Sequence, residues 1–302
     1  MEHRVGTVIS YCTNDFRFLD MCIEEARCFS SQIIVVVADH FFNGEPENRL
    51  LLEKSYQKHP DCLFVEFVYS EKEPYGFYCP VGPSDSDWAH YWHSTSRYIG
   101  FHFLEEMIET VLFADVDEVH DGKRFLEWLD GFDYRSYEVF RLAGYAYFRS
   151  ARYRSLSWHP ISLFARKEAL FPEILLDLQE RQGIFEGIAG KKMKQAVGLD
   201  GRPLVHHFSW VRTREEMLFK TKSWGHRRDE NWEALIEKEF SSSFRGVDSF
   251  YGLHYEEVEP WRDPFESDPF LLQPLLEIKS LPNVVRIDPK SFFRFTILKK
   301  KP

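Results

Sequence analysis

The sequence predicts an α/β protein built around a mixed, mostly parallel sheet flanked by helices. Apolar runs of strand length alternate with segments whose apolar residues recur at helical spacing, which is the pattern of strands joined by helices. Residues 32–38 form an almost continuous apolar run, as expected for a strand covered on both faces. At 302 residues, the chain is long enough for a substantial core.

The first half of the chain contains the clearest elements. A strand over residues 5–11 is expected to lead through a polar turn at Thr13, Asn14 and Asp15 into a helix. Residues 70–92 are rich in Pro, Gly and aromatic residues and interrupt the alternation, which predicts a long loop. The expected elements here are strands over 5–11, 32–38, 62–68 and 111–114 and helices over 18–29, 46–59 and 92–108.

The second half is less regular. Thr213 and Glu216 have the spacing of a capping box, which predicts a helix that begins there. We expect residues 1–257 to form a catalytic domain and the Pro-rich residues 258–302 to form a helical C-terminal extension packed on it. Residues 183–201, which are rich in Gly, predict a looser region. Further expected elements are helices over 123–129, 213–224 and 229–240 and strands over 137–142, 161–165 and 204–210.

Composition narrows the class of protein. The formal net charge of −10 argues against a nucleic-acid partner, because such proteins concentrate basic residues on their surface. The sequence has no apolar run of about 18 residues and no signal-peptide pattern, so no transmembrane segment is expected. The cysteines are odd in number and lack Cys-x-x-Cys spacing, which indicates reduced thiols and a cytoplasmic location. They are Cys12, Cys22, Cys28, Cys62 and Cys79.

The most informative motif is a pair of carboxylates at the end of an apolar run. Asp115 and Asp117 follow residues 111–114, and residues two apart on an extended chain project to the same side. Converging carboxylates suit Mg²⁺ or Mn²⁺, which commonly bring phosphate oxygens into the site. The alternative is a solvated acidic turn, with Asp121 capping the helix that follows.

A second acidic residue ends another predicted strand. Asp39 follows residues 32–38, and ligands of open α/β sheets bind beyond the carboxyl ends of the strands. A carboxylate there suits a ribose hydroxyl or a base N–H group, while the pair Asp115 and Asp117 suits a metal and a diphosphate. Together these positions predict a site for a nucleotide diphosphate.

These features resemble the GT-A nucleotide-sugar glycosyltransferases, especially the family-2-like branch. The resemblance implies a metal-dependent transfer of a sugar from a UDP- or GDP-linked donor to a hydroxyl of a glycan, lipid or protein, with Mn²⁺ or Mg²⁺ as cofactor. It covers about residues 4–120 in order and spacing. The residues that carry it are Asn14, Asp39, Arg97 with Gly100, and the run from Phe113 to Glu118.

The resemblance also implies roles for individual residues. Asn14 would belong to the donor site, Asp39 would contact the nucleoside, and Arg97 would lie near the diphosphate or base. Asp117 would ligate the metal. Asp115 would hold the ribose or a metal-bound water, or share in metal ligation.

Two histidines follow in a later segment, residues 205–210, that resembles the part of GT-A enzymes supplying a histidine ligand to the metal. His206 and His207 alternate along a strand, so only one can face the site. His207 is slightly favoured, because His206 shares the parity of the apolar Leu204. A buried, hydrogen-bonded histidine is the alternative. Lys220, Lys222, His226 and Arg227 could bind a departing diphosphate, but a solvated basic face is the favoured interpretation.

The sequence departs from the family at the catalytic base. Inverting family-2-like enzymes carry a carboxylate, often within Glu-Asp, on a helix after the metal motif, and no Glu-Asp pair lies between Asp121 and His206. Glu186 and Asp177 are the candidates for deprotonating the acceptor. The stereochemical outcome is left open.

Two other classes compete with this interpretation. The run from Asp115 to Val119 matches the nucleophile motif of haloacid-dehalogenase-like phosphatases. That class places the motif on the first strand, however, and no Asp-Asp or Gly-Asp-x-x-x-Asp follows here. A non-catalytic GT-A-like domain that binds carbohydrate or protein is the third possibility. Binding of UDP or GDP with and without Mn²⁺ distinguishes the three.

Overall fold

The parallel strands form where the sequence predicts them. The computed structural model describes residues 3–68, 85–265, 281 and 283–288. Strand β1 (Val5–Tyr11) pairs in parallel with β2 (Gln32–Ala38) on one side and β4 (Thr110–Asp115) on the other, and β2 pairs with β3 (Leu63–Phe67). The predicted strands of the first half are therefore confirmed.

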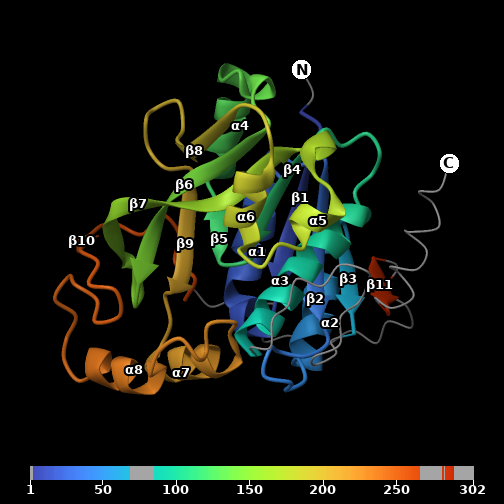
Figure 1. The fold of residues 1–302 in the computed structure, drawn as a ribbon. Helices are drawn as coiled ribbons and strands as arrows, with labels where there is room; N and C mark the ends of the chain where they lie inside the picture. The colour runs from blue at the N-terminus through green and yellow to red at the C-terminus, as the bar shows by residue number, and fades with distance from the viewer. Residues whose placement is uncertain (1–2, 69–84, 266–280, 282, 289–302) are drawn as a thin grey trace.

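A single mixed sheet runs through the molecule (Figure 1). Its order is β11-β3-β2-β1-β4-β7-β6-β9-β5, with β10 added to β7 and β8 to β6. Among the described strands, six pairings are parallel and four are antiparallel, which confirms a mostly parallel sheet. The later strands are β5 (Glu118–His120), β6 (Val139–Phe148), β7 (Ser150–Arg166), β8 (Lys192–Ala196), β9 (Val205–Trp210), β10 (Tyr255–Glu257) and β11 (Val284–Ile287).

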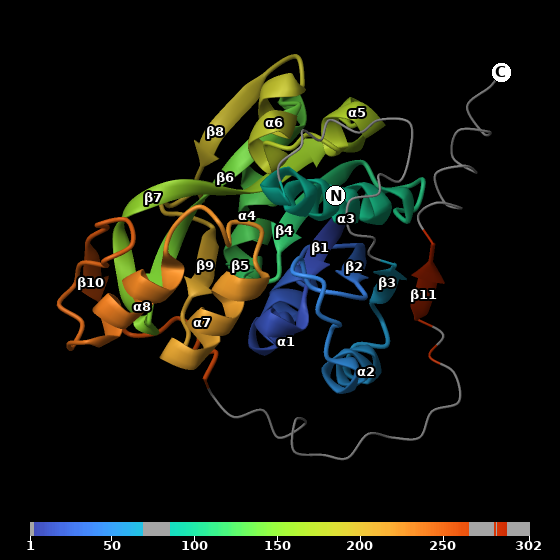
Figure 2. The same cartoon turned by 60° about the horizontal axis from the view of Figure 1, so that its bottom comes forward.

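Both faces of the parallel strands are buried, which explains the apolar run in β2. Ile33, Val35 and Val37 join the core under α1, α2 and α4, whereas Ile34 and Val36 join the core under α3, α5 and α6. Figure 2 shows α1 and α2 on one side of the sheet and α3 on the other. The helices are α1 (Phe16–Ala26), α2 (Arg49–Lys58), α3 (Asp85–His102), α4 (Gly122–Gly131), α5 (Pro172–Leu175), α6 (Glu180–Gly187), α7 (Arg214–Ser223) and α8 (Trp232–Phe240).

Helix α3 differs from the helix predicted over 92–108. It begins at Asp85, so residues 85–92 are helical although a loop was expected there, while residues 70–84 lie outside the described residues. It ends at His102, where the Gln32 side chain donates to the Phe103 carbonyl and accepts from the Glu105 amide. A side chain that satisfies backbone groups in this way competes with helix continuation.

The antiparallel half of the sheet is longer than predicted. Strands expected over 137–142 and 161–165 are parts of a long hairpin of β6 and β7, which turns at Arg149 with φ at 60°. The missing part was not predicted because it is rich in Arg, Ser and Tyr and lacks apolar alternation. The region expected to be loose, 183–201, contains most of α6 and all of β8.

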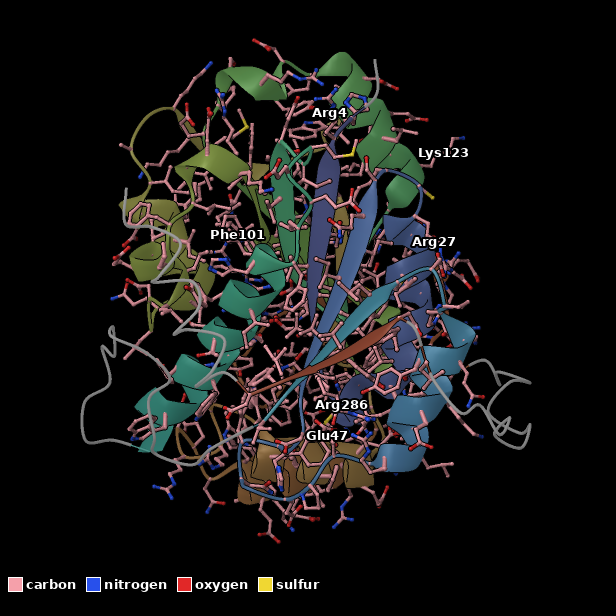
Figure 3. The ribbon with its side chains drawn as sticks, turned by 90° about the vertical axis from the view of Figure 1, so that its right-hand side faces the viewer. Arg4, Arg27, Glu47, Phe101, Lys123 and Arg286 are labelled. Carbon is pink, nitrogen blue, oxygen red and sulfur yellow. The ribbon has the colours of Figure 1, made fainter. Side chains whose placement is uncertain are left out.

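The chain beyond residue 257 adds a strand to the sheet. β11 pairs in parallel with β3, and Nε of Arg286 donates to Oε2 of Glu66 at 3.1 Å (Figure 3). A helical extension was predicted, but the described part of residues 258–302 contains this strand and no helix. Val284, Val285 and Ile287 are β-branched, which favours an extended backbone. The boundary at residue 257 remains a prediction.

Two further predictions concern the start of α7 and the absence of a transmembrane segment. Thr213 and Glu216 make both hydrogen bonds of a capping box at the start of α7, as predicted. Among the described helices, none combines the length and apolar character that a membrane span needs.

Gly100 allows α3 to pack closely on the sheet. A Cβ at this position would lie 2.4 Å from Val8 Cγ1 and 2.9 Å from Val36 Cγ2, distances at which atoms must move. Gly100→Ala should therefore lower the free energy of unfolding by about 1–3 kcal/mol, measured by urea denaturation. Gly225→Ala is the matched control, because its Cβ would meet no atom closer than 3.7 Å. Equal stability of the two variants would contradict this account of the helix packing.

Candidate functional site

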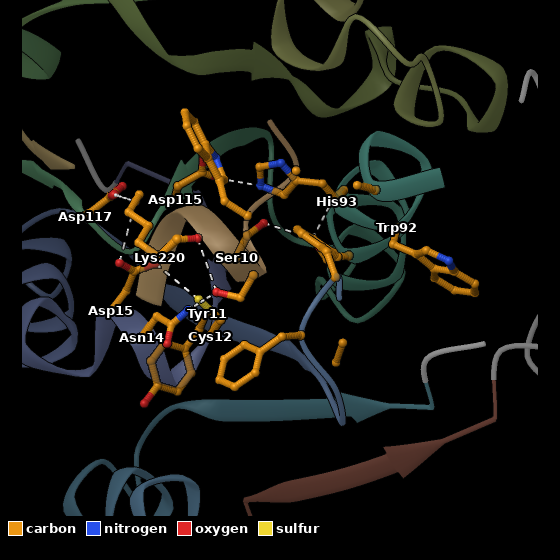
Figure 4. Close-up of a pocket in the computed structure, with 18 of the residues that line it drawn as sticks. Ser10, Tyr11, Cys12, Asn14, Asp15, Trp92, His93, Asp115, Asp117 and Lys220 are labelled. Atoms are coloured by element: carbon orange, nitrogen blue, oxygen red, sulfur yellow. Dashed lines mark hydrogen bonds and ion pairs between the residues drawn. The ribbon is translucent and has the colours of Figure 1, made fainter. Parts of the chain in front are cut away.

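A cavity of about 300 Å³ opens at the carboxyl ends of the parallel strands (Figure 4). Ser10 of β1 is in register with Asp115 of β4 and Val36 of β2, so the three strand ends lie side by side. This edge is where open α/β sheets bind ligands. The polar lining comes from β1 and the following turn, from the end of β4, and from α3, α6, α7 and β9.

Asp115 and Asp117 both line this cavity, as predicted, but a turn and not the alternation of an extended strand brings them there. Asp115 is the last residue of β4, and Asp117 lies in the turn before β5. Asp117 is only 4% exposed. A carboxylate at such depth remains ionised only with positive partners and hydrogen-bond donors around it.

Asp115 is surrounded by three cationic side chains. His93 Nε2 lies 2.9 Å from Asp115 Oδ1, Arg181 Nη2 lies 3.0 Å from Oδ2, and Arg97 Nη2 lies 3.5 Å from Oδ1. Burial by itself raises the pKa of Asp115, but the positive charges of Arg181 and His93 outweigh it and hold that pKa below its ordinary value. Asp115 is therefore an ionised carboxylate in an ion-pair network.

Asp117 is paired with Lys220. The Nζ atom of Lys220 lies 3.2 Å from Asp117 Oδ2 and 3.9 Å from Asp15 Oδ1, and Lys220 is only 6% exposed (Figure 4). Burial raises the pKa of Asp117, but Lys220 and His207 lower it by more. The solvated basic face favoured from the sequence is thus wrong for Lys220, because α7 packs this side chain against the cavity.

The start of α6 contributes two further charges that the sequence did not single out. Glu180 has a φ of 54°, in the left-handed region that is unfavourable for residues with a Cβ. Its carboxylate contacts His90 at 2.8 Å, His93 at 3.1 Å and Arg97 at 3.0 Å. Burial raises the pKa of Glu180, yet the charges of His93 and Arg97 bring it well below its ordinary value.

Arg181 links two acidic residues of the motif. It is hydrogen-bonded to Glu118 Oε2 as well as to Asp115 Oδ2, and Glu118 is 1% exposed. Burial lowers the pKa of Arg181, but Asp115 and Glu118 raise it by more. Glu180 and Arg181 could not be found from periodicity, because only the packing of α6 brings them to β4.

The predicted donor-binding residues have different positions. Asn14 lines the cavity, where its Nδ2 donates to Ser223 Oγ at 2.5 Å and its buried Oδ1 has no partner among the described residues. Asp39 does not line the cavity, although its neighbours Ala38 and His40 do; its carboxylate lies 2.9 Å from His40 Nδ1.

Arg97 lies behind the cavity wall and not in it. Its side chain is 1% exposed, and its Nη2 contacts His93, Asp115 and Glu180. Arg97 thus positions three groups that do line the cavity.

The two histidines separate as their alternation predicts. His207 lines the cavity, and its Nε2 lies 3.6 Å from Asp117 Oδ1. His206 points away from Asp117: its Nδ1 is hydrogen-bonded to the Tyr147 hydroxyl at 2.7 Å, and its ring stacks on Trp261 at 4.1 Å between centroids. His206 therefore has the contacts of the buried histidine that was the alternative interpretation.

Neither predicted base lies in the cavity. Asp177 Oδ1 accepts from the Gln179 amide at 2.7 Å, and the carboxylate lies against Gly183. Glu186 is exposed and is hydrogen-bonded to Gln182 Nε2. Both residues are on the α5–α6 side of the molecule, and the cavity lining includes neither.

Aromatic side chains also line the cavity and lie beside its charged groups, with Phe42 against the His93 ring and Trp224 near the Lys220 ammonium group. Phe41, Phe42, Trp92 and Trp224 contribute to its lining, and Phe41 makes an edge-on contact with Phe219 at 5.7 Å. Flat apolar rings of this kind can stack on the face of a nucleobase or sugar. The cavity therefore combines aromatic side chains with charged ones.

The predicted metal ligands fit a divalent ion in chemistry but not in arrangement. Carboxylates and an imidazole are suitable donors for Mn²⁺, and Asp117 and His207 face each other. The ammonium group of Lys220 and the guanidinium group of Arg181, however, already lie on Asp117 and Asp115. Within the described ranges, no three His, Cys, Asp or Glu side chains gather as a metal site. We therefore assign no metal ligation to this arrangement.

Comparisons with known proteins give structural neighbours only. No family model matches the sequence, and no curated protein matches it. One neighbour is 4-diphosphocytidyl-2C-methyl-D-erythritol synthase from Anaerococcus prevotii, with 11% identity and a TM-score of 0.38 over 72% of this chain and 97% of that one.

Two sugar-transferring enzymes are also among the neighbours. The mannosyltransferase PcManGT from Pyrobaculum calidifontis, in complex with GDP-Man and Mn²⁺, has 11% identity and a TM-score of 0.42 over 74% of this chain and 61% of that one. The glycosyltransferase GlyE of Streptococcus pneumoniae has 11% identity and a TM-score of 0.36 over 80% and 66%. All three TM-scores lie below 0.5, and no fold class, activity or residue role of this chain is assigned from these neighbours.

His206 should make the protein sensitive to acid. Burial lowers the pKa of His206 to about 3, against about 6.5 in an unfolded chain, so below about pH 6.5 the unfolded state takes up a proton that the folded state excludes. Stability should therefore fall as the pH falls. His206→Asn should make the free energy of unfolding less dependent on pH between about pH 7 and pH 5, by up to about 1.4 kcal/mol per pH unit.

Urea denaturation at several pH values measures this effect. Tyr147→Phe is the control, because it removes the hydrogen-bond partner of His206 but keeps the histidine, and it should retain the pH dependence. An unchanged slope for His206→Asn would show that His206 does not exclude the proton.

Proposed function

We propose that the protein is a glycosyltransferase that moves a sugar from a UDP- or GDP-linked donor to an acceptor hydroxyl. The observation that carries this proposal is a cavity at the carboxyl ends of parallel strands that has an aromatic part beside a cluster of charged side chains. A nucleotide sugar has the matching parts, which are a flat base, a ribose, a charged diphosphate and a polar sugar.

The lining residues suit these parts in turn. Phe41, Phe42 and Trp224 offer apolar surface to the base. The unpartnered Oδ1 of Asn14 can accept a hydrogen bond from the base or from a ribose hydroxyl. Asp39, which the resemblance assigns to the nucleoside, is kept as a proposal, since it adjoins the cavity through Ala38 and His40.

The reaction would break the bond between the anomeric carbon and the diphosphate oxygen and form a bond from that carbon to the acceptor oxygen. The acceptor loses a proton, and negative charge develops on the departing diphosphate. Positive groups held in a partly buried site stabilise such charge in the transition state. Glu186 and Asp177 remain the proposals for the base, although neither lines the cavity in the present arrangement.

Metal dependence is a separate part of the prediction. Mn²⁺ or Mg²⁺ at Asp115, Asp117 and His207 follows from the resemblance, and it requires that Lys220 and Arg181 leave the carboxylates. Such an ion, when bound, would supply positive charge to the diphosphate. Nucleotide binding measured in EDTA and in Mn²⁺ distinguishes a metal-bound site from one in which Lys220 and Arg181 stay on the carboxylates.

The two rival functions have weaker support. A phosphatase of the haloacid-dehalogenase type would need Asp115 as a nucleophile, and this carboxylate is enclosed by His93, Arg97 and Arg181. A non-catalytic binding domain would have the same cavity, so turnover and not binding must separate it from an enzyme.

Nucleotide binding tests the proposal directly. UDP or GDP at 100 times its dissociation constant should stabilise the protein by about 2.7 kcal/mol, seen as a rise in melting temperature. UMP and GMP are the controls, and they should bind more weakly because they lack the second phosphate. A panel of UDP- and GDP-sugars should then release the nucleoside diphosphate. Failure of both UDP and GDP to bind, with and without Mn²⁺, would contradict the proposed function.

A further inference from the structure

We infer that this protein binds the diphosphate of its donor with its own cations, Lys220 and Arg181, in the place where a divalent metal ion was predicted. The inference rests on the proposed function, because it concerns how the same cavity holds a nucleotide. It is carried by the contacts of two cationic side chains, one buried and one partly exposed, that approach the Asp117 and Asp115 carboxylates.

Lys220 approaches from α7. Its Nζ lies between Asp117 and Asp15, at 3.2 Å and 3.9 Å, and the side chain is almost fully buried while still lining the cavity (Figure 4). A buried ammonium group needs negative partners, and these two carboxylates provide them. A phosphate oxygen that entered the cavity could share the same ammonium group, which has three donors.

Arg181 approaches from α6, on the far side of the acidic pair. Its guanidinium group contacts Asp115 and Glu118 and lines the cavity, with 12% of the side chain exposed. The planar guanidinium group has five donors in a fork that matches a phosphate. Lys220 thus offers a compact ammonium charge, and Arg181 offers a planar group that can donate two parallel hydrogen bonds. Together they suit the two linked phosphates of a nucleoside diphosphate.

The balance of charge explains why a metal ion is disfavoured in this arrangement. Asp115 and Asp117 are the two predicted oxygen donors, and each already has a cation within 3.2 Å. A divalent ion would have to displace both cations and then remain close to them. Other basic and acidic groups also lie around Asp115 and Asp117. The basic ones are His93, Arg97, His207 and Arg212, and the acidic ones are Asp15, Glu118 and Glu180.

The carboxylates then have a different role from metal ligation. Asp117 holds Lys220, and Asp115 holds Arg181, so that the cations are ordered before the nucleotide arrives. Preorganised charges cost little reorganisation when negative charge develops on the leaving group. Asp115 and Asp117 are positioning residues in this account, while Lys220 and Arg181 touch the substrate.

Asp117→Asn separates the two accounts because they predict opposite results. If Asp117 is a metal ligand, the variant should lose Mn²⁺-dependent binding of UDP or GDP. If Asp117 only positions Lys220, binding should persist within a few-fold, because the ammonium group remains and loses a competitor for the phosphate. Isothermal titration calorimetry of UDP and GDP, in EDTA and in Mn²⁺, measures both cases.

Removal of the cations should have the larger effect. Lys220→Met and Arg181→Gln should each weaken nucleotide binding in EDTA by at least about tenfold, which is about 1.4 kcal/mol. Lys222→Met is the matched control, since Lys222 is exposed on the same helix and is absent from the cavity lining. It should bind as the unmodified protein does.

Lys220→Met leaves Asp117 buried without its partner and could fail to fold. The double variant Lys220→Met with Asp117→Asn removes both charges, and a comparison with Asp117→Asn alone isolates the ammonium group. We expect the single variant to bind UDP or GDP and the double variant to bind at least tenfold more weakly.

Three results would overturn the inference. Binding that EDTA abolishes and Mn²⁺ restores, together with loss of binding in Asp117→Asn, would show metal dependence and leave the proposed glycosyltransferase function intact. Equal binding by the single and double variants would show that Lys220 does not contact the nucleotide. Absence of UDP and GDP binding under every condition would overturn the inference and the proposed function together.

Discussion

Ionised carboxylates at the end of a buried strand need positive partners, and the architecture of the cavity follows from this requirement. Asp115 and Asp117 lie where β4 leaves the sheet, below the level of bulk solvent. Arg181 from α6 and Lys220 from α7 reach them from different parts of the chain. Ion pairs at the cavity therefore connect both helices to the end of β4, although the apolar side of α7 packs elsewhere, with Phe148 and Trp210.

The same requirement explains the ion pairs that join α3 to the start of α6. Arg97 is buried in α3 and contacts His93, Asp115 and Glu180, and Glu180 accepts these contacts from a left-handed backbone position. A residue with a Cβ is held in that conformation only when its surroundings determine it strongly. The contacts of Glu180 with His90, His93 and Arg97 hold this backbone conformation. As a result, Glu180 and Arg181 lie together at the cavity.

The aromatic and the charged residues of the cavity would contribute differently to sugar transfer. The aromatic side chains of the lining offer surface on which a flat base can stack. The positive and negative side chains that line or border the cavity are paired with one another. In the proposed binding mode, an entering diphosphate shares Lys220 and Arg181 with the carboxylates that already hold them.

Local pattern determined much of this protein. The apolar run of β2 and the capping box of α7 each depend on near neighbours in sequence, and the structure has them as predicted. Asp115 and Asp117 both reach the cavity, although a turn and not an extended strand brings them there. Tertiary packing decided the rest. The pairing of Lys220 with Asp117 spans 103 residues and that of Arg181 with Asp115 spans 66, and no periodicity records such contacts. Whether Lys220 faced water or the cavity depended on how α7 docks, because a lysine on a polar helix suits either environment until the fold supplies its partner.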